Sequence, residues 1–195
     1  MTRWYRYPAW ALAALVFSPL VLTWTGCKSV SDEEVKNAMQ VEILDTMWVD
    51  KEFKQWPHPK LVLVPAVKFR IKNLTAEPMK YVSFNGIFKE KNAAENLGDN
   101  FLAAIRKAPI PPGGWSDPIT LKSNFGNEGT SLATFKNNPA WKPLWVKIFA
   151  QWRGSRHVLL GEWPVSMRID FKEPEAPVIQ GGKKAEDVKK DATKK

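Results

Sequence analysis

Strict alternation of apolar and basic residues is the feature of this sequence that most limits its possible folds. It is clearest in residues 61–73, where three apolar residues alternate with three basic ones. These are Val67, Phe69 and Ile71 on one side and Lys68, Arg70 and Lys72 on the other. Successive side chains of an extended strand point to opposite faces. The pattern therefore predicts an antiparallel strand with one face in the core and the other in water.

Shorter segments of the same kind recur along the chain, with turn-forming residues between them. Further strands are predicted at residues 41–49, 80–89, 119–122, 144–153, 158–163 and 165–171. Residues 92–100 are predicted to form a hairpin loop, residues 101–107 fit either a strand or a helix, and residues 130–136 fit one or two helical turns. Seven or eight short strands, with most of the 15 prolines between them, predict an all-β fold. We expect an immunoglobulin-like antiparallel β-sandwich over residues 41–171.

The first 27 residues have the parts of an export signal. Arg3 and Arg6 precede an apolar run over residues 8–25, and Gly26 and Cys27 follow it. A basic start, an apolar core and a small residue at the cleavage site are typical of a secretory signal peptide. The apolar run is also just long enough for an uncleaved membrane anchor. A third interpretation is a cleaved signal in which Cys27, the only cysteine, has no special role.

The end of this segment, Gly26-Cys27, resembles the lipobox of bacterial lipoproteins, with Trp24 where that family usually has Leu, Val or Ile. The resemblance implies that residues 1–26 are removed and that Cys27 becomes the lipidation site, with palmitate among its acyl chains. Two or three acyl chains attach a protein stably to a membrane, whereas a single chain binds reversibly. Lys28 stands where lipoproteins of the inner membrane commonly have aspartate. In a Gram-negative organism the resemblance therefore implies an outer-membrane protein that faces the periplasm.

A second resemblance covers residues 67–126. A strand with the sequence VKFRIKN is followed by VSFNGIFKE and then by the turn and strand PIPPGGWSDPITL. This order resembles the FxLYD-type immunoglobulin-like modules of bacterial envelope lipoproteins. Phe84, Ile87 and Phe88 stand near the aromatic motif of that family, whose Tyr-Asp pair is absent here. The resemblance implies a β-sandwich, and it transfers no catalytic residue.

Both ends of the predicted sandwich have their own composition. Residues 27–40 are predicted to be a tether that ends in a short helix, since Ser31 and Glu34 have the spacing of a capping box. Residues 172–195 contain seven lysines, five acidic residues and few apolar residues, which predicts a disordered tail. A tail of this kind is either solvated without a partner or a basic arm that touches an anionic polymer or membrane.

The positive charge and the predicted export limit the classes of molecule that this protein is expected to bind. The formal net charge is +9, and the predicted signal peptide contributes two of these charges, so +7 remains after its removal. Nucleic acid is not expected as a partner, because no nucleic-acid motif is present and the chain is exported. Anionic lipid, lipopolysaccharide phosphates or an acidic envelope protein are the candidates, and the competing interpretation is a generic basic surface without a specific partner.

No set of residues resembles an active site. The two histidines, His58 and His157, are isolated and have no acidic partner at the spacing of a metal site. We expect neither a metal nor a cofactor. Scattered acidic residues leave a glycosidase with paired carboxylates as the enzymatic alternative.

Tryptophans are the remaining candidates for a binding site. Trp115, Trp141 and Trp145 lie beside proline-containing turns, where an aromatic ring can stack on a sugar or anchor a protein interface. The competing interpretation is that they pack the core. The leading prediction is a non-enzymatic, lipid-anchored periplasmic module that binds another envelope protein. The alternative is a lipoprotein that binds a glycan or lipopolysaccharide through exposed tryptophans and a basic face.

Overall fold

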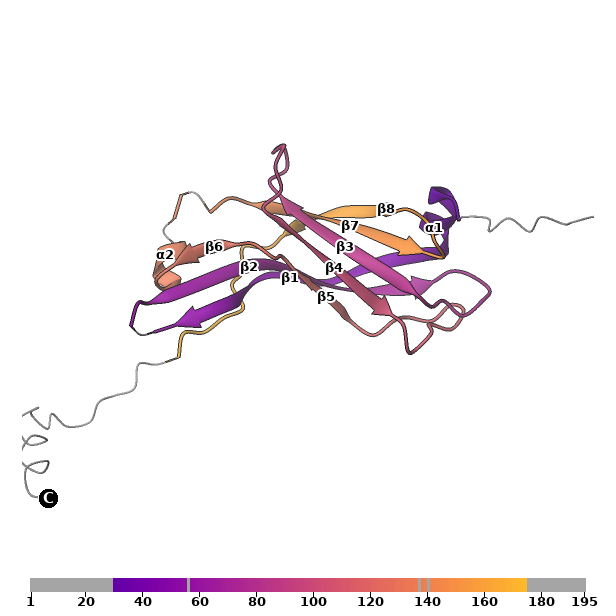
Figure 1. The fold of residues 1–195 in the computed structure, drawn as a ribbon, viewed down its shortest axis with the longest axis horizontal. Coiled ribbons are helices and arrows are strands. Elements are labelled where there is room, and N and C mark those ends of the chain that lie inside the picture. Colours follow the sequence, from indigo (N-terminus) through magenta and orange to yellow (C-terminus); the bar gives the residue numbers. More distant parts are fainter. Residues whose placement is uncertain (1–29, 56, 137, 140, 175–195) are drawn as a thin grey trace, which may run out of the picture.

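The computed structural model describes residues 30–55, 57–136, 138–139 and 141–174. In these residues eight strands form two antiparallel sheets that pack on each other as a sandwich (Figure 1). Sheet I has the order β1-β2-β5, with β6 also paired to β2; its strands are β1 (Met39–Lys54), β2 (Lys60–Asn73), β5 (Ile119–Lys122) and β6 (Asn127–Gly129). Sheet II has the order β4-β3-β7-β8; its strands are β4 (Gly98–Ile105), β3 (Val82–Lys89), β7 (Leu144–Trp152) and β8 (Val158–Val165). The predicted all-β antiparallel sandwich is confirmed.

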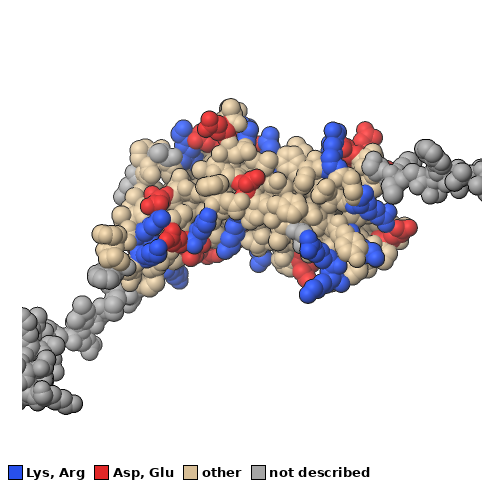
Figure 2. Space-filling model, in the orientation of Figure 1, with Lys and Arg blue, Asp and Glu red and all other residues tan. Residues whose placement is uncertain are grey.

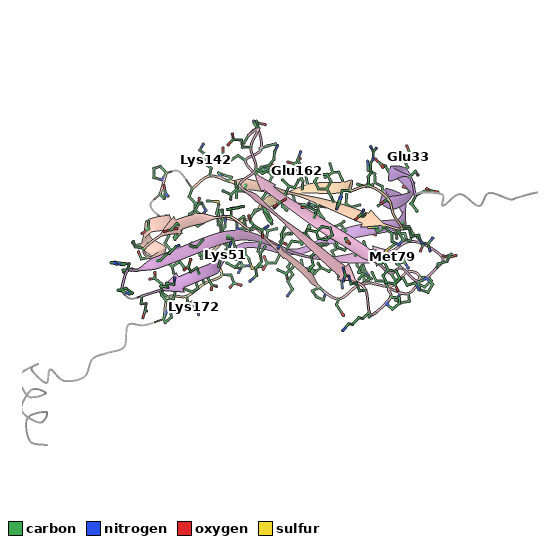
Figure 3. All side chains as sticks on the ribbon, viewed as in Figure 1. Glu33, Lys51, Met79, Lys142, Glu162 and Lys172 are labelled. Carbon is green, nitrogen blue, oxygen red and sulfur yellow. The ribbon has the colours of Figure 1, made fainter. Side chains whose placement is uncertain are left out.

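The two sheets meet through the apolar sides of their strands. Val67, Phe69 and Ile71 of β2 are fully buried, which confirms the face predicted from their alternation. Phe69 meets Phe84 of β3 edge to face, with the ring centroids 5.3 Å apart. Side chains from both sheets fill the space between the ribbons (Figure 3).

The face that β1 buries changes at a β-bulge. Val41 and Ile43 pack against the core, and the register with β2 shifts by one residue after Ile43. Beyond Leu44 the inward position falls on Trp48, which is fully buried and meets Trp141 at a centroid distance of 5.3 Å. A bulge adds one residue to a strand and so turns the following side chains to the other face.

A buried asparagine organises one end of the sandwich. The Asn73 Nδ2 donates hydrogen bonds to the carbonyl oxygens of Glu77 and Ile110, at 2.7 and 3.0 Å. Its backbone also pairs with the proline-glycine turn, where Gly113 donates to the Asn73 carbonyl. Met79, labelled in Figure 3, is fully buried and exchanges two backbone hydrogen bonds with Ile110. These bonds fix the path of the loop that precedes β5.

The capping box predicted before the first helix is confirmed. In α1 (Asp32–Ala38), the Ser31 hydroxyl accepts from the backbone nitrogen of Glu34, and the Glu34 carboxylate accepts from the backbone nitrogen of Ser31. Val35 of this helix is fully buried within the main core. The described part of the predicted tether is therefore packed against the sandwich, and β1 follows it directly.

Two ambiguous segments are resolved by the structure. Residues 101–107 belong mainly to a strand, because β4 extends to Ile105, and β4 also includes the last three residues of the hairpin loop predicted at 92–100. Residues 130–136 contain one short helix, α2 (Leu132–Lys136), in agreement with the predicted one or two helical turns. The three-residue strand β6 has no counterpart in the sequence prediction.

The prediction of a separate strand at residues 165–171 is wrong. β8 continues through Pro164 to Val165, and the following segment makes an isolated bridge between Ile169 and Trp48 of β1. β8 lies at the edge of sheet II, where the missing N–H of a proline can face away from the ladder. Pro164 therefore does not end the strand.

Within the described residues no helix is long and apolar enough to cross a membrane. The signal peptide predicted over residues 1–26, the lipidation site Cys27 and the tail beyond Pro174 lie outside these residues.

Candidate functional site

Trp115 lies on the outer face of sheet I, beneath two basic side chains of β2. It forms an isolated bridge with Lys72, and its ring is half-buried. The guanidinium carbon of Arg70 is 4.3 Å from the ring centroid, and the Lys72 Nζ is 5.8 Å away. Cations placed over an indole ring are attracted by its π-electrons. One face of the ring is thus already covered by positive charge.

The other two predicted tryptophans occupy different places. Trp145 is half-buried on the outer face of sheet II, where the Lys91 Nζ lies 4.6 Å from its ring centroid. Trp141 packs against Trp48 and Phe135, and its indole nitrogen is buried without a hydrogen-bond partner in the described residues. Trp115 and Trp145 lie on opposite outer faces of the sandwich, and Trp141 belongs to the core. The structure therefore does not bring the three predicted binding residues together.

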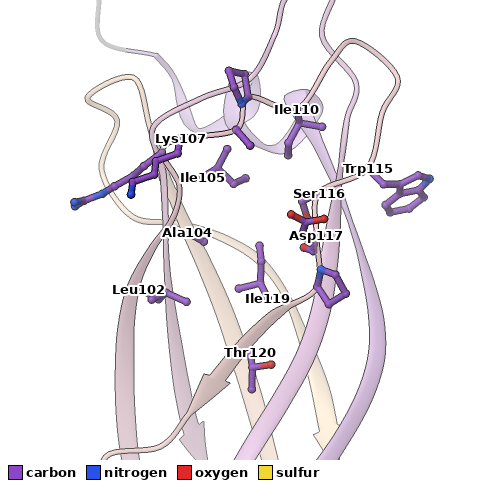
Figure 4. Close-up of a pocket in the computed structure, with 14 residues that line it drawn as sticks. Leu102, Ala104, Ile105, Lys107, Ile110, Trp115, Ser116, Asp117, Ile119 and Thr120 are labelled. Carbon is purple, nitrogen blue, oxygen red and sulfur yellow. The ribbon is translucent and has the colours of Figure 1, made fainter.

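A different feature, a groove, opens where the two sheets separate. At one end β4 is joined to β5 and to the residues that follow it. Asn100 Nδ2 donates to the Lys122 carbonyl at 2.6 Å, and Asn124, two residues beyond β5, donates a backbone hydrogen bond to Asp99 at 3.0 Å. Gly98 sits so close to this seam that a Cβ there would lie 2.3 Å from Ser123 Oγ. In the described part of the chain no other hydrogen bond joins the two strands. They separate beyond the seam and leave a groove, here named the β4–β5 groove (Figure 4).

The floor of the β4–β5 groove is made of side chains that point toward the core. The groove has a volume of about 650 Å³ and is lined by Leu102, residues 104–110 and residues 115–120. Ile105, Ile110 and Ile119 form its floor and are buried in the main core beneath it. Leu102 lies opposite the inward-facing Phe84, yet 39% of its surface is exposed. Sheet I does not cover this side chain, so the groove exposes part of the hydrophobic core.

The two rims of the groove differ in charge. Arg106 and Lys107 follow β4 on one rim, and both are exposed. Ser116 and Asp117 lie on the opposite rim, and Trp115 projects outward beyond them (Figure 4). Among the described residues, Arg106, Lys107 and Asp117 form no ion pair. The basic rim therefore offers two cations that are free to meet a partner.

The carboxyl groups whose pKa is shifted lie outside the groove. The hydrogen bond from Arg156 lowers the pKa of Asp32 at the start of α1. Hydrogen bonds from Lys54 and Lys60 lower the pKa of Glu52 near the tip of the β1–β2 hairpin. These shifts belong to exposed ion pairs and mark no catalytic centre.

The structure also places the two histidines. His157 lies against Phe101 on the surface, with the ring centroids 5.9 Å apart, and His58 lies in the exposed turn between β1 and β2. Nowhere in residues 30–55, 57–136, 138–139 and 141–174 do three His, Cys, Asp or Glu side chains gather as metal ligands.

Sequence reasoning missed the residues that define the groove. Leu102, Arg106 and Lys107 lie in the segment that fits either a strand or a helix, so their faces are not predictable from spacing. The local signal that points to them is a pair of basic residues directly after an apolar run and before the proline-rich turn. That signal indicates a charged rim only after the strand is known.

Comparisons with known proteins give a distant likeness only. No protein-family model and no curated protein matches the chain. Two of the similar solved structures are the Northeast Structural Genomics Consortium target SoR45 and the putative ApaA protein from Bordetella pertussis. SoR45 has a TM-score of 0.38 and 13% identity over 73% of this chain and 98% of its own. The ApaA protein has a TM-score of 0.37 and 12% identity over 66% of this chain and 93% of its own. A β-glucuronidase from glycoside hydrolase family 2 has a TM-score of 0.39 and 13% identity over 65% of this chain, but this match spans only 11% of the enzyme.

Proposed function

We propose that this chain is a non-enzymatic module of the bacterial envelope, anchored by a lipid on Cys27, facing the periplasm, and binding another envelope protein in the β4–β5 groove. The observation that supports a binding role best is Leu102. It occupies an inward-facing position of the sandwich and still has 39% of its surface exposed. An apolar surface that a fold leaves open beside polar rims is typical of a protein-interaction site.

The groove has features that suit a polypeptide partner. Its floor is apolar, its rims are polar or charged, and two strand edges border it. A polypeptide offers apolar side chains for such a floor and backbone groups for such edges. The predicted lipid anchor would hold the module close to other proteins of the envelope, where even a weak interaction is favoured by the high local concentration.

The second candidate function is binding of an anionic glycan or of lipopolysaccharide. It is favoured by Trp115, because Arg70 and Lys72 place positive charge over one face of its ring on the outer face of sheet I. Phosphate or carboxylate groups of such a ligand would pair with these cations. Charge-driven binding would weaken in moderate salt, whereas stacking on the ring would persist in high salt.

Cross-linking in living cells tests the proposed function. A photoreactive residue at Thr120, which lines the groove, should capture one recurrent envelope protein when the full lipoprotein is expressed. The matched control is the same photoreactive residue at Thr134, an exposed threonine of α2 that does not line the groove. Equal products from both positions would show that the groove is no specific site. Capture of lipopolysaccharide or peptidoglycan fragments without a protein would favour the second candidate.

The anchor is tested separately by the substitution Cys27→Ala. The wild-type protein should fractionate with membranes and have the added mass of its acyl chains, whereas the variant should lose both. A variant that stays in the membrane fraction with an unchanged mass relative to wild type would contradict lipidation at Cys27.

A further inference from the structure

We propose that the partner of the β4–β5 groove binds as an extended segment that adds a strand to the free edge of β4 and places carboxylates beside Arg106 and Lys107. This inference rests on the proposed function, because it names the form and chemistry of the protein partner at the same site. It follows from the backbone edges, the exposed floor and the uncompensated charge of one rim.

The edge of β4 that faces the groove has backbone groups available for pairing. In an antiparallel strand, alternate residues turn both N–H and C=O away from the neighbouring strand. The Asp99 carbonyl faces away from β3, since it accepts the hydrogen bond from Asn124. The same alternation turns the backbone groups of Phe101 and Ala103 toward the groove. No described residue bonds these groups, so two N–H donors and two C=O acceptors remain for an added strand.

The facing edge of β5 is less suitable. Lys122 turns its carbonyl toward the groove side, where Asn100 already occupies it. Alternation gives the same direction to Thr120, and the next position, Pro118, has no N–H to donate. β5 therefore offers one complete pair of backbone groups, whereas β4 offers two. This difference assigns the added strand to β4.

The apolar floor of the groove determines which types of side chain the partner segment needs. Side chains of an added strand alternate between the two faces of sheet II. Those that point inward would cover Leu102 and meet Ile105 and Ile119. The partner segment should therefore have apolar residues at alternate positions.

The charges on the two rims determine where the partner segment needs charged residues. Arg106 and Lys107 are exposed, and no acidic group in the described residues compensates them. Asp117 is the acidic residue of the opposite rim, so carboxylates of the partner belong at the end of the segment beside Arg106 and Lys107. A charge-assisted hydrogen bond from arginine to a carboxylate is stronger than a neutral one. The chain's own residues 175–195 have six lysines against four acidic residues, so their charge has the same sign as this rim. An acidic segment of another protein fits the charge better than this tail does.

A β-bulge limits how far an added strand can extend along β4. The register with β3 shifts between the pair Ser83–Ala103 and the pair Val82–Ile105, so Ala104 is an extra residue in β4. Bulges interrupt pairing at sheet edges. The segment should therefore be short, and it should end where Arg106 and Lys107 begin the basic rim.

The test uses the photoreactive residue at Thr120 in the full lipoprotein and measures the yield of the cross-linked protein in cells. Ala103→Pro removes an N–H that faces the groove, at an edge position where proline is tolerated. We expect the yield to fall at least tenfold. The double substitution R106E/K107E changes only exposed side chains, and we expect a similar fall from charge repulsion. The control is Lys142→Glu, which reverses an exposed lysine outside the groove and should leave the yield unchanged.

The outcomes separate the two proposals. Failure to capture any protein at Thr120 would overturn the proposed function and this inference together. Capture that is unchanged in both Ala103→Pro and R106E/K107E would leave the binding role intact and overturn strand addition by an acidic segment. A cross-link to a second copy of this chain would overturn the assignment to a different protein. Thermal unfolding of each variant, with a melting temperature close to that of the wild type, would show that lost capture is not lost folding.

Discussion

The backbone nitrogen of Asn124 donates a hydrogen bond to the carbonyl of Asp99, and this bond marks the point at which the two sheets stop being joined along one side. On one side of it the seam is tight, and Gly98 has no room for a Cβ. On the other side β4 and β5 diverge over the apolar floor of the groove. In the face seen in Figure 2, on which β3 and β4 lie in front, lysine and arginine side chains gather toward both ends and the middle is mostly uncharged. The groove is thus a local opening between the two sheets.

Exposure of Leu102 predicts an unusually small cost for its truncation. Leu63 of β2 is fully buried, so Leu63→Ala should lower the free energy of unfolding by about 2–5 kcal/mol. Leu102→Ala removes the same atoms from a side chain that is 39% exposed and already borders an open groove, and we expect a loss of about 1.5 kcal/mol. Denaturant unfolding of the two variants measures both values. Equal losses would show that Leu102 is covered in solution and that the groove is closed.

The strands that the sequence predicts well are those whose two faces differ. Residues 67–72 of β2 alternate because one face is buried and the other is wet, and this difference appears directly in the sequence. β4 lacks such a contrast, since Phe101 and Leu102 lie on opposite faces and are 54% and 39% exposed. Apolar residues then occupy both faces, and spacing alone cannot distinguish a strand from a helix. The identity of β4 depends on its pairing with β3.

The candidate site, too, could not be predicted from spacing within single strands. The groove exists because β4 and β5, which are in different sheets, diverge beyond the bond between Asn124 and Asp99. No pattern within either strand encodes that divergence. The tryptophans were predicted as binding residues from their residue type alone. Whether they lie together depends on the face of the sheet on which each side chain stands. Trp48 illustrates the difficulty, since the bulge after Ile43 reverses the faces that simple alternation would assign.

Burial of Val35 predicts that α1 contributes to the stability of the sandwich. This side chain is fully buried in the main core, although the sequence places it in a predicted tether. Val35→Ala removes two methyl groups from a packed site and should lower the free energy of unfolding by about 2 kcal/mol, which is the transfer cost with a small cavity term. The exposed Lys36→Ala is the matched control and should have little effect. If both variants unfolded like the wild type, the helix would be detached from the sandwich in solution.

The contact between Arg70 and Trp115 predicts a measurable coupling energy. The guanidinium carbon lies 4.3 Å from the ring centroid, and Arg70 Nε also pairs with Glu42 at 2.6 Å. Cation–π contacts at exposed sites contribute about 0.5–1 kcal/mol. A double-mutant cycle with Arg70→Ala and Trp115→Ala should give a coupling energy in that range, because the pair with Glu42 cancels in the cycle. A coupling energy of zero would mean that the ring does not hold the guanidinium in solution.

Stability of the α1 end should depend on pH through Asp32. The Arg156 guanidinium pairs with this carboxylate at 2.6 Å and lowers the pKa of Asp32 below its ordinary value of about 3.9. The folded state therefore binds this proton less readily than the unfolded chain does. The pair stabilises the fold fully above about pH 4 to 5, and this contribution is lost as the pH falls through the lowered pKa.

Asp32→Asn tests this dependence directly. The variant should melt at a lower temperature than the wild type at pH 7. The difference should shrink as the pH falls below about 4 and through the lowered pKa of Asp32, because below that pKa both side chains are neutral. Glu33→Gln is the control, since Glu33 lies in the same first turn and, in the described structure, makes no ion pair with Arg156. It should show a smaller difference, which reflects the helix dipole alone. A gap between wild type and Asp32→Asn that stayed constant from pH 7 to pH 3 would mean that the hydrogen-bond geometry of the side chain, and not its charge, stabilises this end of the sandwich.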